Sequence, residues 1–466
     1  MRKLPVLLFV MILLFLDLIT SKAMNNPYVI EQIDQFTIFH SNDGTLTIIE
    51  YLGEESDLII PDEIDGLSVT MIDEYAFCGN WHLQSVVIPE SIKEIGSFAF
   101  TACQNLKLLI IDNGATVIGD YAFAECHGLE KVSIGTSIEY IGNYAFKGCR
   151  ALKEISLGNQ LISIGKYAFF DCRSLKTLEL PESVKSLGSG AFADCWEMTE
   201  ITLPDRIETI PDKCFSGCVN LTAISFGNQT KCIGEQSFYD CVSLTEIALP
   251  HMLISIGPRA FEGCYGLSKI YLPSTLEVIG SYAFRQCVNL SYVEIGKNVR
   301  VIDMNPFEKC PELSQIMVSP DNNNFCIHNG LLYSIDGKRI ITFFEKQDQR
   351  DCIVNDGVMV IDNSAFDYSH ITSVTLPKSV NEISTQMFAY CRNLSTVYLP
   401  EGIQSIQAYA FSNCDDLTEL TIPCSVVYIG PWAFPENTSL NVYAGSYSSL
   451  YAEEHGIPYR KIVVSE

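Results

Sequence analysis

A phrase of 23 residues repeats along most of this chain. Its consensus is Ile-Gly-x-x-Ala-Phe-x-x-Cys-x-x-Leu-x-x-Val-x-Ile-Pro. Phenylalanine marks the same position in successive copies, at Phe77, Phe100, Phe123, Phe146, Phe169, Phe192, Phe215, Phe238, Phe261, Phe284, Phe307, Phe366, Phe388, Phe411 and Phe434. A fixed short period means that each copy contacts mainly its neighbours, so the chain can be long without one central core.

Each repeat predicts a short strand followed by a return path. Leu178 and Leu180 alternate with Thr177 and Glu179, so the leucines face inward and the polar residues face outward. Pro181 ends the strand because it has no N–H for a sheet. A period of 20–29 residues built on Leu-x-x-Leu-x-Leu is the signature of a leucine-rich-repeat solenoid. We therefore predict a mainly β solenoid with a parallel strand ladder, short helical turns and buried repeat phenylalanines.

The period breaks once, between Phe307 and Phe366. Asp336-Gly337 lies there between two apolar runs, which is a hairpin signal. Caps are expected at both ends because an open solenoid end exposes its core. The predicted segments are a signal peptide at 1–23, an N-terminal cap at 24–70, repeats at 71–318, an inserted hairpin unit at 319–356, repeats at 357–445 and a C-terminal cap at 446–466.

The first residues predict export. A basic start precedes an apolar run that ends near Ile19, and Ser21-Lys22-Ala23 supplies small residues for cleavage. The alternative is an uncleaved signal anchor, although the apolar run is short for a spanning helix. No later apolar run has spanning length. We expect a secreted or cell-surface protein with no membrane span after signal removal.

The charge balance narrows the classes of partner. The chain has 56 Asp and Glu against 30 Lys and Arg, for a formal net charge of -26. Nucleic acids and anionic membranes are bound by basic patches. We therefore expect no nucleic-acid partner.

Twelve of the 18 cysteines share one repeat position, three residues after the phenylalanine. Stacked coils place equivalent residues about 4.8 Å apart with parallel Cβ directions, whereas a disulfide needs Cβ atoms at roughly 3.5–4.5 Å. We predict a ladder of buried thiols. Cys326 and Cys352 flank the inserted unit and are the candidate disulfide, with two further thiols as the alternative. No Cys-x-x-Cys pair occurs and the histidines are scattered, so no metal site is expected.

No catalytic motif is present. The chain lacks Gly-x-Ser-x-Gly, His-Glu-x-x-His and a phosphate-binding glycine loop. We therefore expect a protein that is not an enzyme and that needs no cofactor.

The outward strand positions contain a candidate ligand-binding patch of Lys269, Tyr271, Tyr292, Glu294 and Met317. Aromatic and Met enrichment on an exposed surface is typical of a binding centre. Two alternatives remain open. Aromatic residues favour strands for packing reasons alone, or the inserted hairpin covers these side chains.

A second outward patch is apolar and lies near the N-terminus. It consists of Val87, Leu108 and Ile110. Exposed apolar patches mark interaction sites, but the N-terminal cap is an alternative cover for this one.

The repeat phrase, the cap phrase Asp65-Gly66-Leu67-Ser68-Val69-Thr70 and the closing Tyr451 to Tyr459 resemble the BspA-like leucine-rich repeats of bacterial surface and secreted proteins. Characterised members are adhesins for host matrix proteins or other bacteria. The resemblance implies adhesion or recognition, with a protein or glycan ligand on a host or neighbouring cell. It implies no fixed binding residues, and neither a sorting signal nor an attachment domain is found. The alternative function is a structural or assembly module of the cell envelope.

Overall fold

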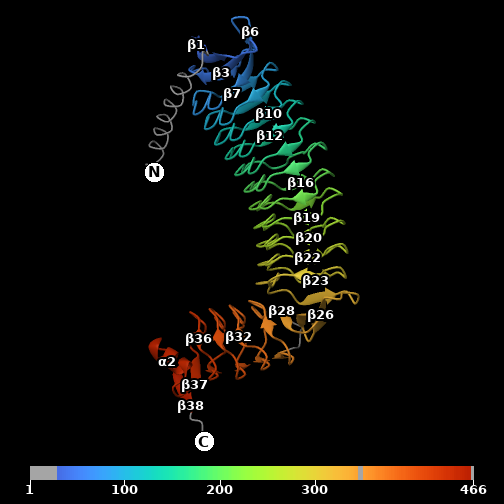
Figure 1. Ribbon diagram of the computed structural model, residues 1–466, viewed down its shortest axis with the longest axis vertical. Helices are drawn as coiled ribbons and strands as arrows, with labels where there is room; N and C mark the ends of the chain where they lie inside the picture. The colour runs from blue at the N-terminus through green and yellow to red at the C-terminus, as the bar shows by residue number, and fades with distance from the viewer. Residues whose placement is uncertain (1–28, 345–349, 463–466) are drawn as a thin grey trace. The chain divides into compact units, whose positions relative to one another are not determined.

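The computed structural model describes residues 29–344 and 350–462. The chain divides into two compact units, Met1–Leu161 and Ile162–Glu466. In each unit the described chain winds as a β-solenoid, with strands stacked coil upon coil (Figure 1). The predicted signal peptide, residues 1–23, lies outside the described residues.

One strand of each coil forms a parallel ladder that we call the strand face. In the first unit it consists of β4 (Asp57–Ile59), β7 (Ser85–Ile88), β9 (Leu108–Ile111), β11 (Lys131–Ile134) and β13 (Glu154–Ser156). In the second unit it includes β16 (Glu200–Thr202), β18 (Ala223–Ser225), β21 (Lys269–Tyr271), β23 (Tyr292–Ile295), β25 (Gln315–Val318), β29 (Asp351–Ile353), β31 (Ser373–Thr375), β33 (Thr396–Tyr398) and β35 (Glu419–Thr421). At Glu179 the ladder is reduced to a single bridge with Thr202.

A second parallel ladder of mostly two-residue strands forms the far wall. In the first unit these are β6 (Leu67–Ile72), β8 (Glu94–Ile95), β10 (Val117–Ile118) and β12 (Tyr140–Ile141). In the second unit they are β14 (Ser163–Ile164), β15 (Ser186–Leu187), β17 (Thr209–Ile210), β19 (Cys232–Ile233), β20 (Ser255–Ile256), β22 (Val278–Ile279), β24 (Val301–Ile302), β30 (Val360–Ile361), β32 (Glu382–Ile383), β34 (Ser405–Ile406) and β36 (Tyr428–Ile429). Their apolar residue points inward in each coil, as Ile279 and Ile256 do.

The segment around each repeat phenylalanine is a series of hydrogen-bonded turns rather than a length of helix. Around Phe284, the residues two before and two after it, Tyr282 and Gln286, both have φ of 60°. The N–H groups of these three residues donate to carbonyls of the next coil at 2.8–3.3 Å, whereas the intervening N–H groups donate within their own coil. We call the N–H groups at the phenylalanine and at two residues on either side the ladder N–H groups.

The repeat phenylalanines form the core, as predicted. Phe77 stacks on Phe100 with ring centroids 4.5 Å apart in the first unit. Phe192 stacks on Phe215 at 5.6 Å in the second. Most of these rings have relative exposures of 0–2 %. Rings inside the array therefore lose their contact with water by packing between two equivalents of themselves.

The N-terminal end is covered by an antiparallel sheet of β1 (Ile30–Ile33), β2 (Phe36–His40) and β3 (Leu46–Tyr51), while β5 (Glu63–Ile64) pairs with β6. β2 and β3 form a hairpin around Asp43-Gly44. β3 pairs in parallel with β6 and so joins this sheet to the far wall. Tyr51 stacks on Phe77 at 5.1 Å and closes the phenylalanine column.

The stretch between the two runs of repeats contains β26 (Phe325–His328), β27 (Leu331–Ser334) and β28 (Arg339–Phe343), which pair antiparallel. The predicted hairpin around Asp336-Gly337 is the turn between β27 and β28. β28 also pairs in parallel with β30, and Phe343 stacks on Phe366 at 5.5 Å. This part of the stretch therefore supplies the far wall and the core ring of one coil.

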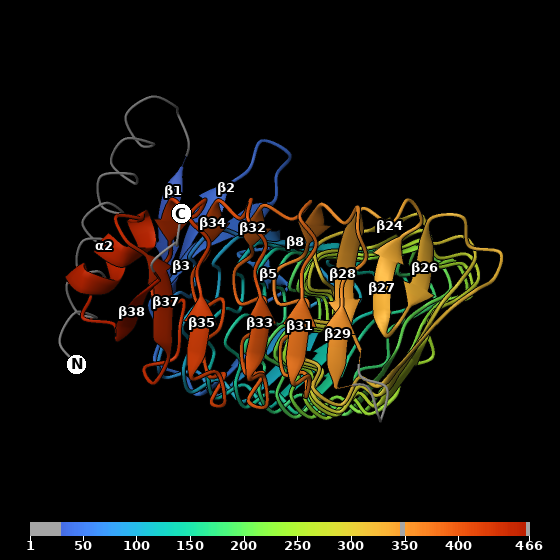
Figure 2. The ribbon, with the colours of Figure 1, turned by 90° about the horizontal axis from the view of Figure 1, so that it is seen from below.

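The C-terminal end consists of β37 (Ser439–Tyr443), α2 (Tyr447–Glu454) and β38 (Tyr459–Ile462). β37 continues the strand face beside β35, and β38 pairs in parallel with β37. Figure 2 shows β29, β31, β33 and β35 side by side, followed by β37, β38 and the helix. Ser446 caps α2 by accepting the Ser449 N–H.

Candidate binding surfaces

The structure brings the five predicted residues of the strand-face patch together. β21, β23 and β25 are neighbours, with Lys269 opposite Tyr292, Tyr271 opposite Glu294, and Glu294 opposite Met317. The rings of Tyr271 and Tyr292 lie 5.8 Å apart and are tilted by 47°. We call these five residues the tyrosine patch.

The tyrosine patch is open to solvent. Tyr271 is 61 % exposed and Met317 is 50 % exposed. Lys269 and Glu294 are exposed, and Tyr292 is half-buried. The alternative that the inserted hairpin covers this patch does not hold for the described residues, because covered side chains would not keep these exposures.

Polar contacts orient the patch. The Tyr292 hydroxyl donates to Glu294 Oε2 at 3.3 Å. Partial loss of hydration, followed by the neighbouring carboxylate, raises the pKa of Tyr292. The phenol is therefore a hydrogen-bond donor at neutral pH, and the patch presents rings, one cation and one carboxylate on a single face.

The apolar patch near the N-terminus is also on the strand face. Val87 lies opposite Ile110 and opposite Ile59, which is 72 % exposed at the edge strand β4. Val87, Leu108 and Ile110 are half-buried. The row is longer than the sequence indicated because Ile59, in the segment read as a cap, extends it.

The repeat cysteines form the predicted ladder of buried side chains. In most coils the thiol donates to the carbonyl of the phenylalanine one coil earlier, as Cys218 does to Phe192 at 3.2 Å and Cys264 to Phe238 at 3.2 Å. Burial raises the pKa of Cys218 to about 12. The thiol therefore acts as a small apolar group with one weak donor, which suits a position facing a backbone carbonyl.

The candidate disulfide is not formed in the structure. Cys326 and Cys352 are both free thiols. Cys326 lies on β26 opposite Tyr333, whereas Cys352 lies on the strand face beside Val374. Burial raises the pKa of Cys352 to about 12, which leaves it protonated and unreactive at neutral pH.

A buried charge ladder runs along three coils at the position after the phenylalanine. Arg285 donates to Glu262 at 2.9 Å and to Glu308 at 3.1 Å, and both carboxylates are about 4 % exposed. Burial raises the pKa of Glu308, although Arg285 opposes that shift. The equivalent position in most coils is uncharged, so this ladder was not recognised from the repeat phrase.

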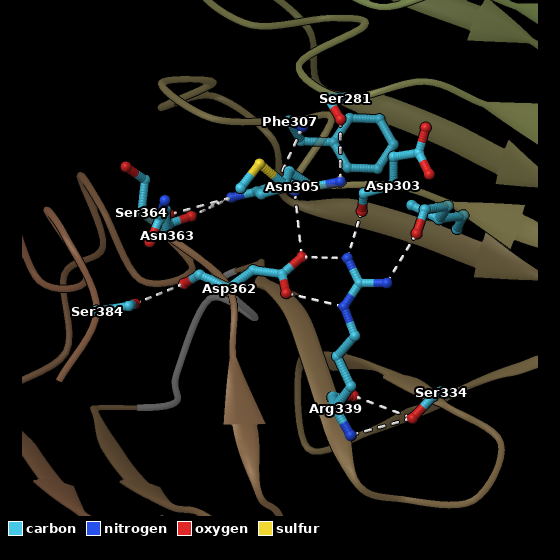
Figure 3. Close-up of polar contacts among 12 residues, drawn as sticks. Ser281, Asp303, Asn305, Phe307, Ser334, Arg339, Asp362, Asn363, Ser364 and Ser384 are labelled. Atoms are coloured by element: carbon cyan, nitrogen blue, oxygen red, sulfur yellow. Dashed lines mark hydrogen bonds and ion pairs between the residues drawn. The ribbon is translucent and has the colours of Figure 1, made fainter. Parts of the chain in front are cut away.

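A second network lies where the period breaks (Figure 3). Arg339 on β28 binds the Asp362 carboxylate through two hydrogen bonds of 2.8 and 2.6 Å. The same guanidinium donates to the carbonyls of Ile302 and Asp303 at the end of β24. In other coils an N–H of the next coil donates to the carbonyl equivalent to that of Ile302, as Asp303 N–H does to Ile279 O. Arg339 therefore donates to a carbonyl of the far wall that lacks a backbone donor from a next coil.

A cleft of about 680 Å³ lies between the last repeat turn and the C-terminal segment. Its walls include Pro431, Trp432, Phe434, Tyr451, His455 and Pro458. We call it the cap cleft. Sequence reasoning missed it, since its residues come from two segments whose packing is a tertiary property.

Over residues 29–344 and 350–462, no group of three His, Cys, Asp or Glu side chains is arranged to hold a metal ion. No helix in this part of the chain is both long and apolar enough to cross a membrane.

Comparison with known proteins identifies the repeat. The family described as BspA type leucine rich repeat region matches residues 70–197, 185–314 and 340–444, which together exceed half of the chain. A leucine-rich repeat protein from Bacteroides ovatus is 25 % identical, with a TM-score of 0.57, over 93 % of this chain and 100 % of that one. A leucine rich cell surface protein from Faecalibacterium prausnitzii is 21 % identical, with a TM-score of 0.40, over 95 % and 96 % of the two chains. No curated protein matches. The chain belongs to the BspA-type leucine-rich-repeat family.

Proposed function

We propose that this chain is a non-enzymatic extracellular binding protein that acts in adhesion or cell-surface recognition through the tyrosine patch. The observation that carries the proposal is the pair Tyr271 and Tyr292, whose rings lie 5.8 Å apart on neighbouring exposed strands. Two rigid aromatic side chains offer contact area at low entropic cost. The predicted signal peptide and the family resemblance support an extracellular setting.

The chemistry of the patch favours a protein or glycan ligand. Tyrosine rings pack on apolar side chains or sugar faces, and Lys269, Glu294 and the two phenols supply hydrogen bonds around them. The ladder backbone holds these groups in register, so little freedom is lost on binding.

The test compares the mature chain, residues 24–466, with a Tyr271→Ala, Tyr292→Ala double variant. Binding is measured to surfaces coated with extracellular-matrix proteins and to intact bacterial cells. The double variant should fold normally and lose more than about 2 kcal/mol of affinity, the threshold for a hot spot.

A matched control is available on the same unit. Tyr398 faces outward on β33 and is 60 % exposed, close to the 61 % of Tyr271. Tyr398→Ala should leave binding unchanged. Retention of full affinity by the double variant would refute the assignment of the patch. Failure of the parent chain to bind any of these surfaces would count against the adhesion proposal itself.

A further inference from the structure

The hydrogen bonds of the ladder N–H groups differ between the interior of the array and its ends. Inside the array most of these groups donate to a carbonyl of the next coil. Tyr409 N–H donates to Pro431 O at 3.1 Å, and Phe411 N–H donates to Ala433 O at 2.8 Å. A coil without a successor leaves these donors without partners, which is costly unless something else accepts their hydrogen bonds.

At the break in the period, side chains accept the hydrogen bonds of the ladder N–H groups. The coil of Phe307 has no regular successor, and side chains take over as acceptors. Asn305 N–H donates to Asp362 Oδ2 at 3.2 Å, and Phe307 N–H donates to Asn305 Oδ1 at 3.0 Å. Lys309 N–H donates to Asp367 Oδ2 at 3.0 Å. All three ladder donors of that coil are therefore satisfied.

The last coil is different. Two of the three equivalent donors of its phenylalanine turn are the N–H groups of Trp432 and Phe434, and neither makes a hydrogen bond within the described parts of the chain. Trp432 has a positive φ of 52°, as the equivalent residue has in most other coils, so the turn keeps the ladder geometry at this position. The last coil therefore presents these two donors at the end of the array.

These donors border the cap cleft, whose walls are aromatic and proline-rich. Trp432 is 69 % exposed, and one face of its indole stacks on Tyr409 at 5.4 Å. The Tyr451 hydroxyl donates to Gly430 O at 3.4 Å, and the Tyr451 ring stacks on His455 of the same segment at 4.1 Å. Phe434 is only partly buried, unlike the other repeat phenylalanines, because no further coil covers it.

The N–H groups of Trp432 and Phe434 are donors at one edge of the cleft. The carbonyls of Pro431 and Ala433 already accept hydrogen bonds from the preceding coil. A ligand that pairs with these two N–H groups must therefore supply acceptors at this edge. Proline residues meet this condition, since they keep the carbonyl and lack the N–H. Proline-rich segments in extended form dock into aromatic-lined grooves for the same reason.

The charge of the cleft adds one requirement. Glu436 is the charged side chain among the described residues that line it. Glu453 and Glu454 follow on the exposed side of α2. A cationic residue in the ligand would be attracted by this local field, which also has the sign of the whole chain.

We propose that the cap cleft binds an extended proline-rich peptide bearing a basic residue, whose carbonyls accept the N–H groups of Trp432 and Phe434. The site is separate from the tyrosine patch and stands whether or not that patch binds a ligand. The peptide takes the place of the next coil, with its prolines against the free face of Trp432.

The binding test uses a short synthetic peptide rich in proline with one arginine, titrated into the mature chain. Calorimetric titration measures the affinity, because Trp432→Ala removes the tryptophan at the cleft, and this variant should bind about tenfold or more weakly than the parent. Trp81→Ala is the matched control, because Trp81 is also an exposed tryptophan, at 65 %, and lies outside the cleft. Equal affinity of the parent and Trp432→Ala would overturn the proposal, as would equal binding of the same peptide with alanine in place of proline.

A second measurement tests the donor row in the unaltered protein. Amide hydrogen exchange at residues 431–437 should slow when the peptide is added, while exchange at Trp81 stays the same. Unchanged exchange at saturating peptide would overturn the proposed hydrogen bonds. If a neutral oligosaccharide binds in place of the peptide and Trp432→Ala loses the same affinity for it, the peptide assignment would be overturned and the ligand would be a carbohydrate.

Discussion

Arg339 and Asp362 form a two-point ion pair at the place where the repeat period breaks, with N···O distances of 2.8 and 2.6 Å. The Asp362 side chain is 6 % exposed, and the Arg339 side chain is 30 % exposed. The pair joins β28 to β30, and Arg339 also donates hydrogen bonds to the carbonyls of Ile302 and Asp303. At Ile302 the arginine thus replaces the backbone donor that a next coil would supply.

Replacing Arg339 by alanine should lower the free energy of unfolding by roughly 3–5 kcal/mol, because it leaves a buried carboxylate without a counter-ion. Arg300→Ala is the control. Arg300 binds Glu277 at 2.8 Å but is 60 % exposed, so its loss should cost less than about 1 kcal/mol. Urea unfolding measures both. Equal losses would show that the junction pair is no more important than a surface pair.

The Arg339→Ala deficit should also depend on pH. Burial raises the pKa of Asp362, and Arg339 opposes that rise. Without Arg339 the folded-state pKa should rise further above the ordinary value of 3.8. Such a group contributes stability that is present below its unfolded pKa and lost as pH rises through its folded pKa. The deficit should therefore shrink between about pH 7 and about pH 4, and a constant deficit would contradict this account.

Truncating a core ring should destabilise the array more than truncating an outward side chain. Phe192 has 0 % exposure and stacks on Phe169 and Phe215 at 5.6 Å each. Phe192→Ala should cost about 3–5 kcal/mol because it opens a cavity. Glu179→Ala removes an exposed side chain from the same region and should change stability by less than about 0.5 kcal/mol. Similar melting temperatures for the two variants would mean that the inward and outward faces are assigned wrongly.

The buried thiols predict a loss of stability in alkali. Burial raises the pKa of Cys218 and Cys391 from 9.0 to about 12. Stability from keeping these thiols neutral is complete below pH 9.0 and is lost as pH rises towards 12. Urea midpoints should fall over that window. Alkylation followed by mass spectrometry should label exposed Cys424 in the native protein at about pH 8 and reach Cys218 only after unfolding. Labelling of Cys218 in the native state would disprove its burial.

Much of the fold is readable from the repeat. The alternation at Leu178 predicts its inward position, and the period predicts that Phe192 stacks on its equivalents. The register of Tyr271 and Tyr292 follows too, since residues one period apart must be neighbours in a parallel ladder. The turn geometry around the phenylalanines did not follow, because positive φ at residues such as Tyr282 is imposed by hydrogen bonds to the next coil.

The sequence by itself determined the solenoid, its buried rings and thiols, and which side chains share the strand face. These features repeat, so one local rule applied at each period is sufficient to place them. Only the tertiary structure decided what happens where the period stops. In the coil of Phe307, the side chains of Asp362 and Asp367 accept hydrogen bonds from ladder N–H groups. Beside Phe434, a cleft lies between the last turn and the C-terminal cap. Those contacts join residues with no common period, and their partners are set by how the segments pack.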